Sequence, residues 1–281
     1  MNTIAVLLTC YNRKEKTLQC LKSLFEADLP SEYSVEVFLV DDGSTDGTGE
    51  AVEENFPQVK VIQGNGNLFW NQGMRLAWKT AVETKEYDFF LWLNDDTIID
   101  NDAIIKLLRD DKDAKNKTGT AVLITAACRK EAGINEFSYG GRNDMGPVIP
   151  NGEIQFCTYI NGNLVLVPQA IYKKIGMLSI HYTHALGDND YGLRAIQNSY
   201  QCFTTKTYLA TCPPNYGIPG WCNPRNSLRK RWKLLHSPLG LNIKEYNQYR
   251  KKFWGAKWMK FAFKAYLKTI IPKTYAKLSK S

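Results

Sequence analysis

The chain has 281 residues, of which 44% are hydrophobic, enough for one large domain or one domain with an appendage. No stretch approaches the roughly 18 apolar residues of a membrane-spanning helix. The first residues show neither a basic region nor a cleavage site, so we expect no signal peptide. Seven cysteines, without a Cys-x-x-Cys pair or zinc-like spacing, indicate free thiols in a reducing cytosol.

The net charge of +8 is distributed unevenly along the chain. Residues 224–281 hold 16 lysines and arginines and a single acid, Glu245, which gives this segment a net charge of +15. Residues 1–223 hold 20 basic and 27 acidic residues, a net charge of −7. Such asymmetry indicates a basic segment that meets an anionic surface.

The first part of the chain alternates between strand and helix patterns. Apolar runs predict strands at 3–9, 35–40, 59–63 and 87–93, and helical periodicity predicts helices at 17–25, 46–55, 71–84 and near 104–108. Strands separated by helices of this length imply right-handed crossovers and a mostly parallel sheet. Because ligands bind at the carboxyl ends of such strands, we expect the loops 9–13, 41–46 and 94–97 to meet at one edge.

The later pattern is less regular. Residues 139–151 are rich in Gly, Asn and Pro, which is typical of a long loop or hairpin. An apolar run at 163–167 precedes a short helix at 168–175, and the acidic stretch 187–190 precedes a further helix.

The pair Asp95-Asp96 follows directly after the apolar run 89–93. Adjacent carboxylates repel each other, and at a strand end they are most useful when a cation lies between them and an anionic ligand. Magnesium or manganese bridging a diphosphate meets this description. The alternative is a solvated turn and helix cap, because a helix is predicted to begin near Asn101.

Four short motifs stand in order on these elements: TCYNR at 9–13, VDDGSTD at 40–46, LNDD at 93–96 and GDNDYGLR at 187–194. Together they resemble the family 2 glycosyltransferases over about residues 3–212. The resemblance implies the GT-A fold, an α/β architecture with a Rossmann-like, mostly parallel central sheet flanked by helices, here with a basic C-terminal helical extension. Residues 1–223 would be the catalytic domain, with a nucleotide-binding half at 1–100 and an acceptor half at 101–223, and 224–281 the extension.

The resemblance implies roles for residues on the donor side. Tyr11 lies where the family packs the nucleotide base, although a turn tyrosine is the alternative. Asp42 matches the carboxylate that hydrogen-bonds the base or ribose. Asp41 and Asp46 are expected to act locally, as a turn acceptor and a helix N-cap. The remaining expected donor-binding residues are Thr9, Asn12, Arg13, Asn65, Arg75, Asn94 and Asp95.

Asp96 matches the metal ligand of the family's DxD-type motif, and Asp95 matches its neighbour toward ribose or metal. Mn²⁺ or Mg²⁺ is therefore the expected cofactor, since both accept oxygen ligands and neutralise a departing diphosphate. The third ligand stays open, and we expect the three histidines, His181, His184 and His236, to be structural.

Asp188 matches the family's catalytic base, which in an inverting transfer takes the proton from the acceptor hydroxyl. The family usually carries Glu-Asp at this point, whereas this chain has Gly187-Asp188. This departure leaves Asp190 open as an alternative base. Both aspartates would also suit the start of the following helix, where carboxylates are stabilised.

The basic extension carries two stripes at helical spacing, a cationic one of Lys257, Lys260, Lys264 and Lys268 and an apolar one of Trp254, Trp258, Phe261 and Ala265. The pattern is typical of a helix that lies on an anionic bilayer, so we expect membrane contact through 225–271. A charged face that covers the catalytic domain and a homodimer contact are the alternatives.

The sequence therefore predicts a cytoplasmic, metal-dependent, inverting glycosyltransferase, peripheral on the inner face of the membrane. It would move one sugar from a nucleoside diphosphate sugar, by expectation a UDP-sugar, to a hydroxyl of a growing or lipid-linked glycan in cell-surface polysaccharide or lipopolysaccharide assembly. A nucleotidyltransferase acting on sugar phosphates usually has a Gly-rich loop after the first strand, which 9–13 lacks. A nucleic-acid-binding protein is disfavoured because acidic loops would repel a phosphate backbone.

Overall fold

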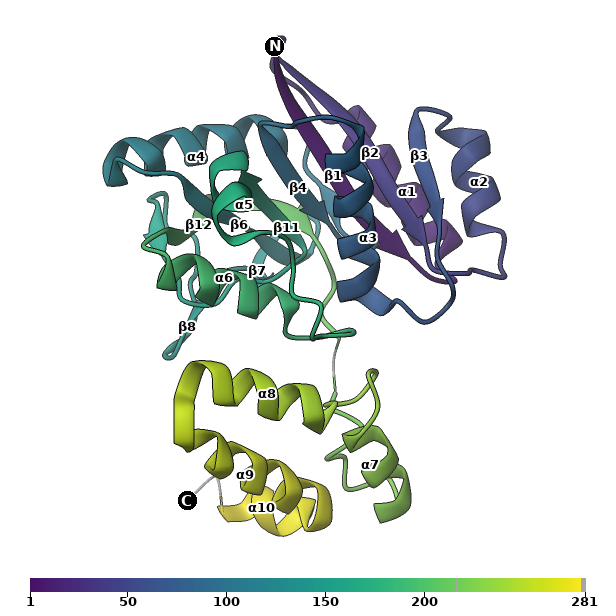
Figure 1. Ribbon diagram of the computed structural model, residues 1–281, viewed down its shortest axis with the longest axis vertical. Coiled ribbons are helices and arrows are strands. Elements are labelled where there is room, and N and C mark those ends of the chain that lie inside the picture. Colours follow the sequence, from purple (N-terminus) through teal and green to yellow (C-terminus); the bar gives the residue numbers. More distant parts are fainter. Residues whose placement is uncertain (216, 279–281) are drawn as a thin grey trace. The chain divides into compact units, whose positions relative to one another are not determined.

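The computed structural model describes residues 1–215 and 217–278 (Figure 1). The chain divides into two compact units. Unit 1 comprises Met1–Ile180 and Gly187–Pro214, and unit 2 comprises 181–186 and the residues from 215 onward.

Unit 1 is built on one large mixed sheet with the strand order β10-β12-β6-β11-β4-β1-β2-β3. In chain order, these strands are β1 (Asn2–Cys10), β2 (Tyr33–Asp41), β3 (Val59–Gln63), β4 (Phe89–Leu93), β6 (Val122–Glu131), β10 (Gln155–Phe156), β11 (Leu164–Pro168) and β12 (Gln201–Thr211). β1 runs parallel to β2 and β4, β2 to β3, and β6 to β12, whereas β11 is antiparallel between β4 and β6. The predicted α/β class with a mostly parallel sheet is confirmed.

Short strands complete unit 1. β5 (Ile98–Ile99) pairs with β12, and β7 (Ile134–Tyr139) pairs with β6. The Gly-rich stretch expected to be a loop or hairpin contains the small hairpin β8 (Arg142–Asn143) and β9 (Gly146–Pro147).

Helices cover both faces of the sheet, because its central strands are apolar on both sides (Figure 1). The unit 1 helices are α1 (Lys14–Glu26), α2 (Thr48–Asn55), α3 (Phe69–Thr84), α4 (Ala103–Thr118), α5 (Gln169–Ile175) and α6 (Gly187–Gln197). Apolar side chains of α1, α2 and α4 pack on the face that holds Val6 and Leu8. Those of α3, α5 and α6 pack on the face that holds Leu7 and Trp92.

The structure departs from the expected elements in two places within unit 1. The long strands β6 and β12 were not predicted, because Thr, Lys or Arg interrupts their apolar residues, although glycines flank β6 and Pro213-Pro214 follow β12. The acidic stretch 187–190 forms the first turn of α6 and does not precede it.

Unit 2 contains the helices α7 (Leu228–Leu235), α8 (Ile243–Trp254), α9 (Trp258–Ile270) and α10 (Pro272–Leu278), with a 3₁₀ turn at Gly255–Lys257. Leu235, Ile243 and Ala265 form its small core. The buried guanidinium of Arg231 donates to the carbonyl oxygens of Thr269 (2.6 Å) and Ile270 (3.3 Å), which closes the end of α9.

The sequence predicted one apolar helical face of Trp254, Trp258, Phe261 and Ala265 that meets a bilayer. The structure contradicts this single exposed face. Gly255, with a φ of 51°, ends α8, so Trp254 and Trp258 belong to different helices. The Trp254 ring lies 5.9 Å from the ring of Phe261, and Ala265 is buried. These side chains therefore pack inside unit 2. No helix in the described part of the chain has the length and apolar character needed to cross a bilayer.

Candidate active site

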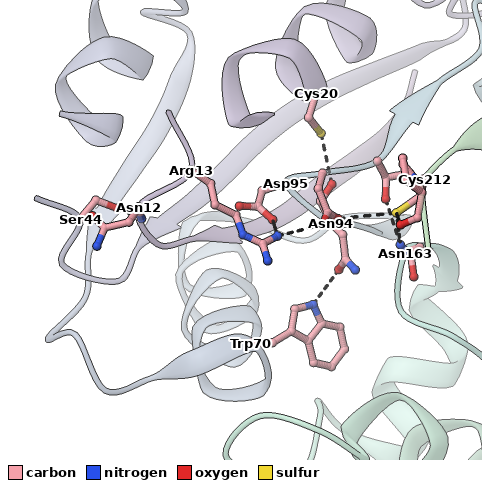
Figure 2. A network of polar contacts seen from close by, with 12 residues as sticks. Asn12, Arg13, Cys20, Ser44, Trp70, Asn94, Asp95, Asn163 and Cys212 are labelled. Carbon is pink, nitrogen blue, oxygen red and sulfur yellow. Dashed lines mark hydrogen bonds and ion pairs between the residues drawn. The ribbon is translucent and has the colours of Figure 1, made fainter. Parts of the chain in front are cut away.

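The Asp95-Asp96 pair lies just after β4 and shares one cationic partner, Arg13, from the loop after β1 (Figure 2). Arg13 Nη1 lies 3.1 Å from Asp95 Oδ1 and 2.9 Å from Asp96 Oδ2. Because β1 and β4 are parallel neighbours, residues 82 and 83 positions apart meet at one sheet edge. The structure thus brings together three of the residues expected to hold the donor or the metal.

Asp95 is a strongly perturbed carboxyl group. Asp95 is only 6% exposed, and its carboxylate oxygen Oδ2 has no hydrogen-bond partner among the described residues. Burial raises the pKa of Asp95 to about 7, the Arg13 charge opposes this rise, and the Asp96 charge adds to it. A buried carboxylate oxygen without a donor costs free energy, and a cation would offset that cost.

A frame of polar contacts holds this loop on its other side. Trp70, at the start of α3, donates its indole N–H to Asn94 Oδ1 at 2.7 Å (Figure 2). Asn94 donates its backbone N–H to the carbonyl of Asn163 at 2.9 Å. Asn163 in turn donates its side-chain amide to Thr97 Oγ1 at 3.1 Å and lies 3.2 Å from the sulfur of Cys212. Asn94 therefore holds the loop in place through both its side chain and its backbone.

Trp70, Asn163 and Cys212 were not among the predicted site residues. Trp70 lies in the first turn of α3, and the other two flank β11 and β12, each without a local motif that marks it. Their role follows only from contacts between distant segments. The Cys212 sulfur also lies 3.8 Å from Asp96 Oδ1. The cysteines are free, and all except Cys222 are buried, as expected.

The loops after β1 and β2 are tied to each other. Asn12 donates its backbone N–H to Ser44 Oγ at 2.9 Å, and its Oδ1 accepts the backbone N–H of Thr45 at 2.7 Å. Asp41 Oδ1 accepts the N–H of Ser44 at 2.9 Å, and Asp46 Oδ1 accepts the N–H of Thr48 at 3.1 Å. The predicted role of Asp41 as a turn acceptor is confirmed. The prediction of Asp46 as the helix N-cap is wrong by one position, because Gly47 is the N-cap of α2 and Asp46 precedes it.

Asp42 holds the loop that leads into α3. Its Oδ1 accepts the backbone N–H of Gly66 at 2.9 Å, and its Oδ2 accepts those of Leu68 at 2.8 Å and Phe69 at 2.9 Å. Phe69 has a φ of 54°, a left-handed conformation that costs a bulky side chain free energy, and Asp42 helps to hold it there. These three bonds are internal to the fold, so the expected contact of Asp42 with the base or ribose stays a prediction.

The other expected donor-binding residues are placed less directly. Tyr11 is 53% exposed on the loop after β1. Asn65 Oδ1 accepts the N–H of Asn67 at 3.0 Å, within its own loop. Arg75 donates to the carbonyl of Leu178. Thr9 packs closely against Gly73 of α3, since a Cβ added at Gly73 would lie 2.2 Å from Thr9 Oγ1. These contacts of Asn65 and Arg75 do not reach the Asp95-Asp96 pair.

Asp188 lies in the first turn of α6. Its Oδ2 accepts the N–H of Gly162 at 3.1 Å, and its Oδ1 accepts the N–H of Asn189 at 2.7 Å. Burial raises the pKa of Asp188, and these N–H groups oppose the rise. Gly162 packs directly against the Trp70 ring, since a Cβ added at Gly162 would lie only 2.4 Å from that ring. Asp188 is thus linked through Gly162 and Trp70 to the loop that carries Asp95.

The departure at Gly187 has a steric reason. A Cβ at this position would lie 1.8 Å from Oδ1 of Asn71 on α3, so a glutamate side chain does not fit this packing. Asp190 differs from Asp188 in being fully buried and paired with Arg194, whose Nε lies 2.7 Å from its Oδ2. Arg194 also donates to the carbonyls of Ile175 and Met177, which fastens the pair to the fold.

His181 and His184 belong to unit 2, and His236 caps the end of α7 with its ring 5.2 Å from that of Trp232. Within residues 1–215 and 217–278, no three His, Cys, Asp or Glu side chains are arranged to hold a metal ion.

Comparison with known proteins gives a consistent result. The family model described as "Glycosyl transferase family 2" matches residues 5–157. A poly-β-1,6-N-acetyl-D-glucosamine synthase from Staphylococcus epidermidis is 30% identical over 116 residues, 39% of this chain and 25% of that protein. One from Staphylococcus aureus is 29% identical over 104 residues, 36% of this chain. The chain thus spans about a quarter of the length of these relatives.

Two similar solved structures share the fold. A mannosyltransferase from Pyrobaculum calidifontis, PcManGT, in complex with GDP-Man and Mn²⁺, has a TM-score of 0.57 at 14% identity, covering 99% of this chain and 78% of that one. Residues 1–349 of TarS from S. aureus, in complex with UDP-GlcNAc, have a TM-score of 0.55 at 16% identity, covering 90% and 73%. The architecture expected from the resemblance is confirmed.

Proposed function

The chain belongs to glycosyl transferase family 2, and we propose that unit 1 moves one sugar from a nucleoside diphosphate sugar to a hydroxyl of a growing glycan. The observation that carries this proposal is the meeting of Arg13, Asp95 and Asp96 at one sheet edge, with Asp188 linked to it through Gly162 and Trp70. The donor would bind at the carboxyl ends of β1, β2 and β4.

A UDP-sugar is the donor that we favour. TarS was solved with UDP-GlcNAc, and the staphylococcal relatives are named for a polymer of N-acetylglucosamine. PcManGT was solved with GDP-Man, so a guanosine donor is the competing choice. The names of the relatives also support a role in the assembly of a cell-surface polysaccharide, with a glycan or lipid-linked glycan as acceptor.

We propose that Asp95 and Asp96 hold Mn²⁺ or Mg²⁺ together with the donor. Their carboxylates are hard oxygen ligands, and the partnerless Oδ2 of Asp95 fits a cation. The complex of PcManGT with Mn²⁺ supports the same choice. Phosphate oxygens and water would complete the ligand set. When bound, the ion would neutralise charge on the leaving diphosphate. Arg13, released from the two carboxylates, is then placed to meet the same phosphates.

We propose Asp188 as the general base of an inverting transfer. A carboxyl group whose pKa is raised by burial accepts a proton more readily at neutral pH than an exposed one. Asp190 is the weaker candidate, because its carboxylate is fully buried and paired with Arg194. Asp188 would take the proton from the acceptor hydroxyl as that oxygen attacks the anomeric carbon.

We also propose that the enzyme works at the cytoplasmic surface of a membrane. The net charge of +15 on residues 224–281 favours an anionic surface, and lipid-linked acceptors would be presented there.

A donor panel tests the proposed function. UDP-, GDP- and dTDP-sugars would each be added with Mn²⁺ or Mg²⁺, and the melting temperature and donor hydrolysis would be measured. A donor at 100 times its dissociation constant should raise the free energy of unfolding by about 2.7 kcal/mol. The proposal predicts metal-dependent stabilisation by at least one donor class. Equal melting temperatures with every donor and metal would contradict it.

A further inference from the structure

One face of α9 exposes large apolar side chains to solvent. Met259, Phe263 and Ile270 are 58%, 65% and 48% exposed. Their spacings of four and seven residues place them within about 40° of arc on a helix with 3.6 residues per turn. They form one continuous outward stripe, which we call the α9 face.

The α9 face is distinct from the side of the helix that packs. Ala262, Ala265 and Thr269 are buried and point into unit 2, where Ala265 joins the small core. The helix therefore meets its packing requirement without Met259 or Phe263. A stripe of exposed Met, Phe and Ile on a helix that is already packed marks a surface for interaction.

The charge around this face is uniformly positive. Lys260 and Lys264 are exposed beside the apolar stripe, and Lys273 is exposed on α10. Glu245 is the only acid in the sequence of 224–281, and its carboxylate accepts the backbone N–H (3.0 Å) and the hydroxyl (2.6 Å) of Thr183. Lys260 and Lys264, which lie beside the α9 face, thus have no acid within residues 224–281 except Glu245, which is bonded to Thr183.

A small cavity continues the face at the C-terminal end of α9. It has a volume of about 220 Å³, and its wall includes Ile270, Ile271, Arg231 and Lys273. Ile270 and Ile271 give this surface apolar walls and Lys273 gives it an exposed cation, whereas the Arg231 guanidinium is already bonded to backbone carbonyls. A cation beside apolar walls suits a phosphate headgroup with its attached carbon chain.

We propose that the α9 face docks on an anionic phospholipid bilayer, with Met259, Phe263 and Ile270 in the acyl boundary and Lys260 and Lys264 against the headgroup phosphates. This inference deepens the proposed membrane location and replaces the stripe expected from the sequence. A bilayer fits better than a nucleic acid or a charged glycan, because a polyanion would pair with the lysines and leave the apolar stripe in water.

Vesicle flotation tests the proposal with the full-length protein. Vesicles of 70% phosphatidylcholine and 30% phosphatidylglycerol would be compared with pure phosphatidylcholine for the wild type, Met259→Ser/Phe263→Ser and Lys260→Gln/Lys264→Gln. Each double variant should lose about tenfold or more in partition coefficient on the anionic vesicles. Matched controls are Ile134→Ser, at a site 50% exposed on β7, and Lys22→Gln/Lys79→Gln on α1 and α3, which should bind like the wild type.

Three results would overturn the proposal. The wild type could fail to float with anionic vesicles, or the lysine pair alone could matter, which indicates a polyanion. The wild type could also be a dimer that Met259→Ser/Phe263→Ser separates without any vesicle binding, which assigns the face to a second copy.

Donor hydrolysis in solution should stay unchanged in all variants. Loss of vesicle binding with intact hydrolysis would then leave the proposed sugar transfer standing.

Discussion

The loops after β2 and β4 both carry adjacent aspartates at the same sheet edge, yet their carboxylates are bonded differently. Asp42 accepts three backbone N–H groups, which are fixed donors of the fold. Asp95 and Asp96 share Arg13, a half-exposed side-chain partner, and Asp95 Oδ2 has no partner among the described residues. A carboxylate filled by backbone donors shapes a loop, whereas one with a displaceable partner is available to a ligand.

The largest expected effect is on the loop after β4. Asp96→Ala should lower the rate of sugar transfer on the order of a thousandfold, because it removes a ligand worth several kcal/mol of charge stabilisation. The melting temperature should change little, since Asp96 is partly exposed, pairs with the half-exposed Arg13 and otherwise lies near the Cys212 thiol. Steady-state kinetics with thermal unfolding measures both. A large fall in melting temperature together with an unchanged kcat would contradict this comparison.

Asp42→Ala should have the opposite profile. Removing the acceptor of three N–H groups, one of them on the left-handed Phe69, should lower the free energy of unfolding by about 3 kcal/mol. Urea denaturation measures the change, with Asp96→Ala as the matched control. If Asp42→Ala were as stable as the wild type, its carboxylate would be a ligand group and the distinction would fail.

Asp111 on α4 tests whether an underbonded buried carboxylate is enough to mark a site. Burial raises its pKa to about 6, and its Oδ1 has no hydrogen-bond partner among the described residues. Between pH 4 and 6 the folded state therefore binds more protons than the unfolded state, so stability falls as pH rises through this window.

Replacing Asp111 with Asn removes this ionisation. At pH 7 the variant should gain up to about 3 kcal/mol in the free energy of unfolding, and the gain should vanish below pH 4. Urea denaturation at several pH values measures it. Transfer activity should stay at the wild-type rate, because Asp111 lies in the interior of α4, which carries none of the proposed site residues. A loss of activity would mean that a buried carboxylate without a full set of hydrogen bonds marks a functional group even outside the site loops.

The smallest effect concerns Arg13 itself. Because its guanidinium bridges both carboxylates, Arg13→Met should tighten binding of Mn²⁺ without donor by about tenfold, the loss of one competing charge. Lys22→Met on α1 is the control, since it is equally cationic but lies elsewhere. Electron paramagnetic resonance of free Mn²⁺ measures the affinity. Weaker binding in Arg13→Met would show that Arg13 supports the ion and does not compete with it.

The sequence predicted the half of unit 1 that carries local signals. β1 to β4 are short apolar runs ended by turn residues, so their order and the meeting of Arg13 with Asp95 followed from a parallel sheet. The frame of Trp70, Asn94 and Asn163 could not be predicted, because each contact joins segments with no shared motif. The apolar stripe of the extension was misplaced since Gly255 divides it between two helices.

Asp188 and Asp190 lie two residues apart but differ in burial, since Asp188 is partly exposed whereas Asp190 is fully buried and paired with Arg194. Their comparison tests the proposed mechanism. Transfer rate and donor affinity would be measured for Asp188→Asn and Asp190→Asn by product formation and calorimetry. We predict that Asp188→Asn loses transfer by at least about a hundredfold, as expected for a general base, with donor affinity nearly unchanged. Asp190→Asn should mainly lose stability through Arg194. Full transfer by Asp188→Asn would contradict the proposed mechanism.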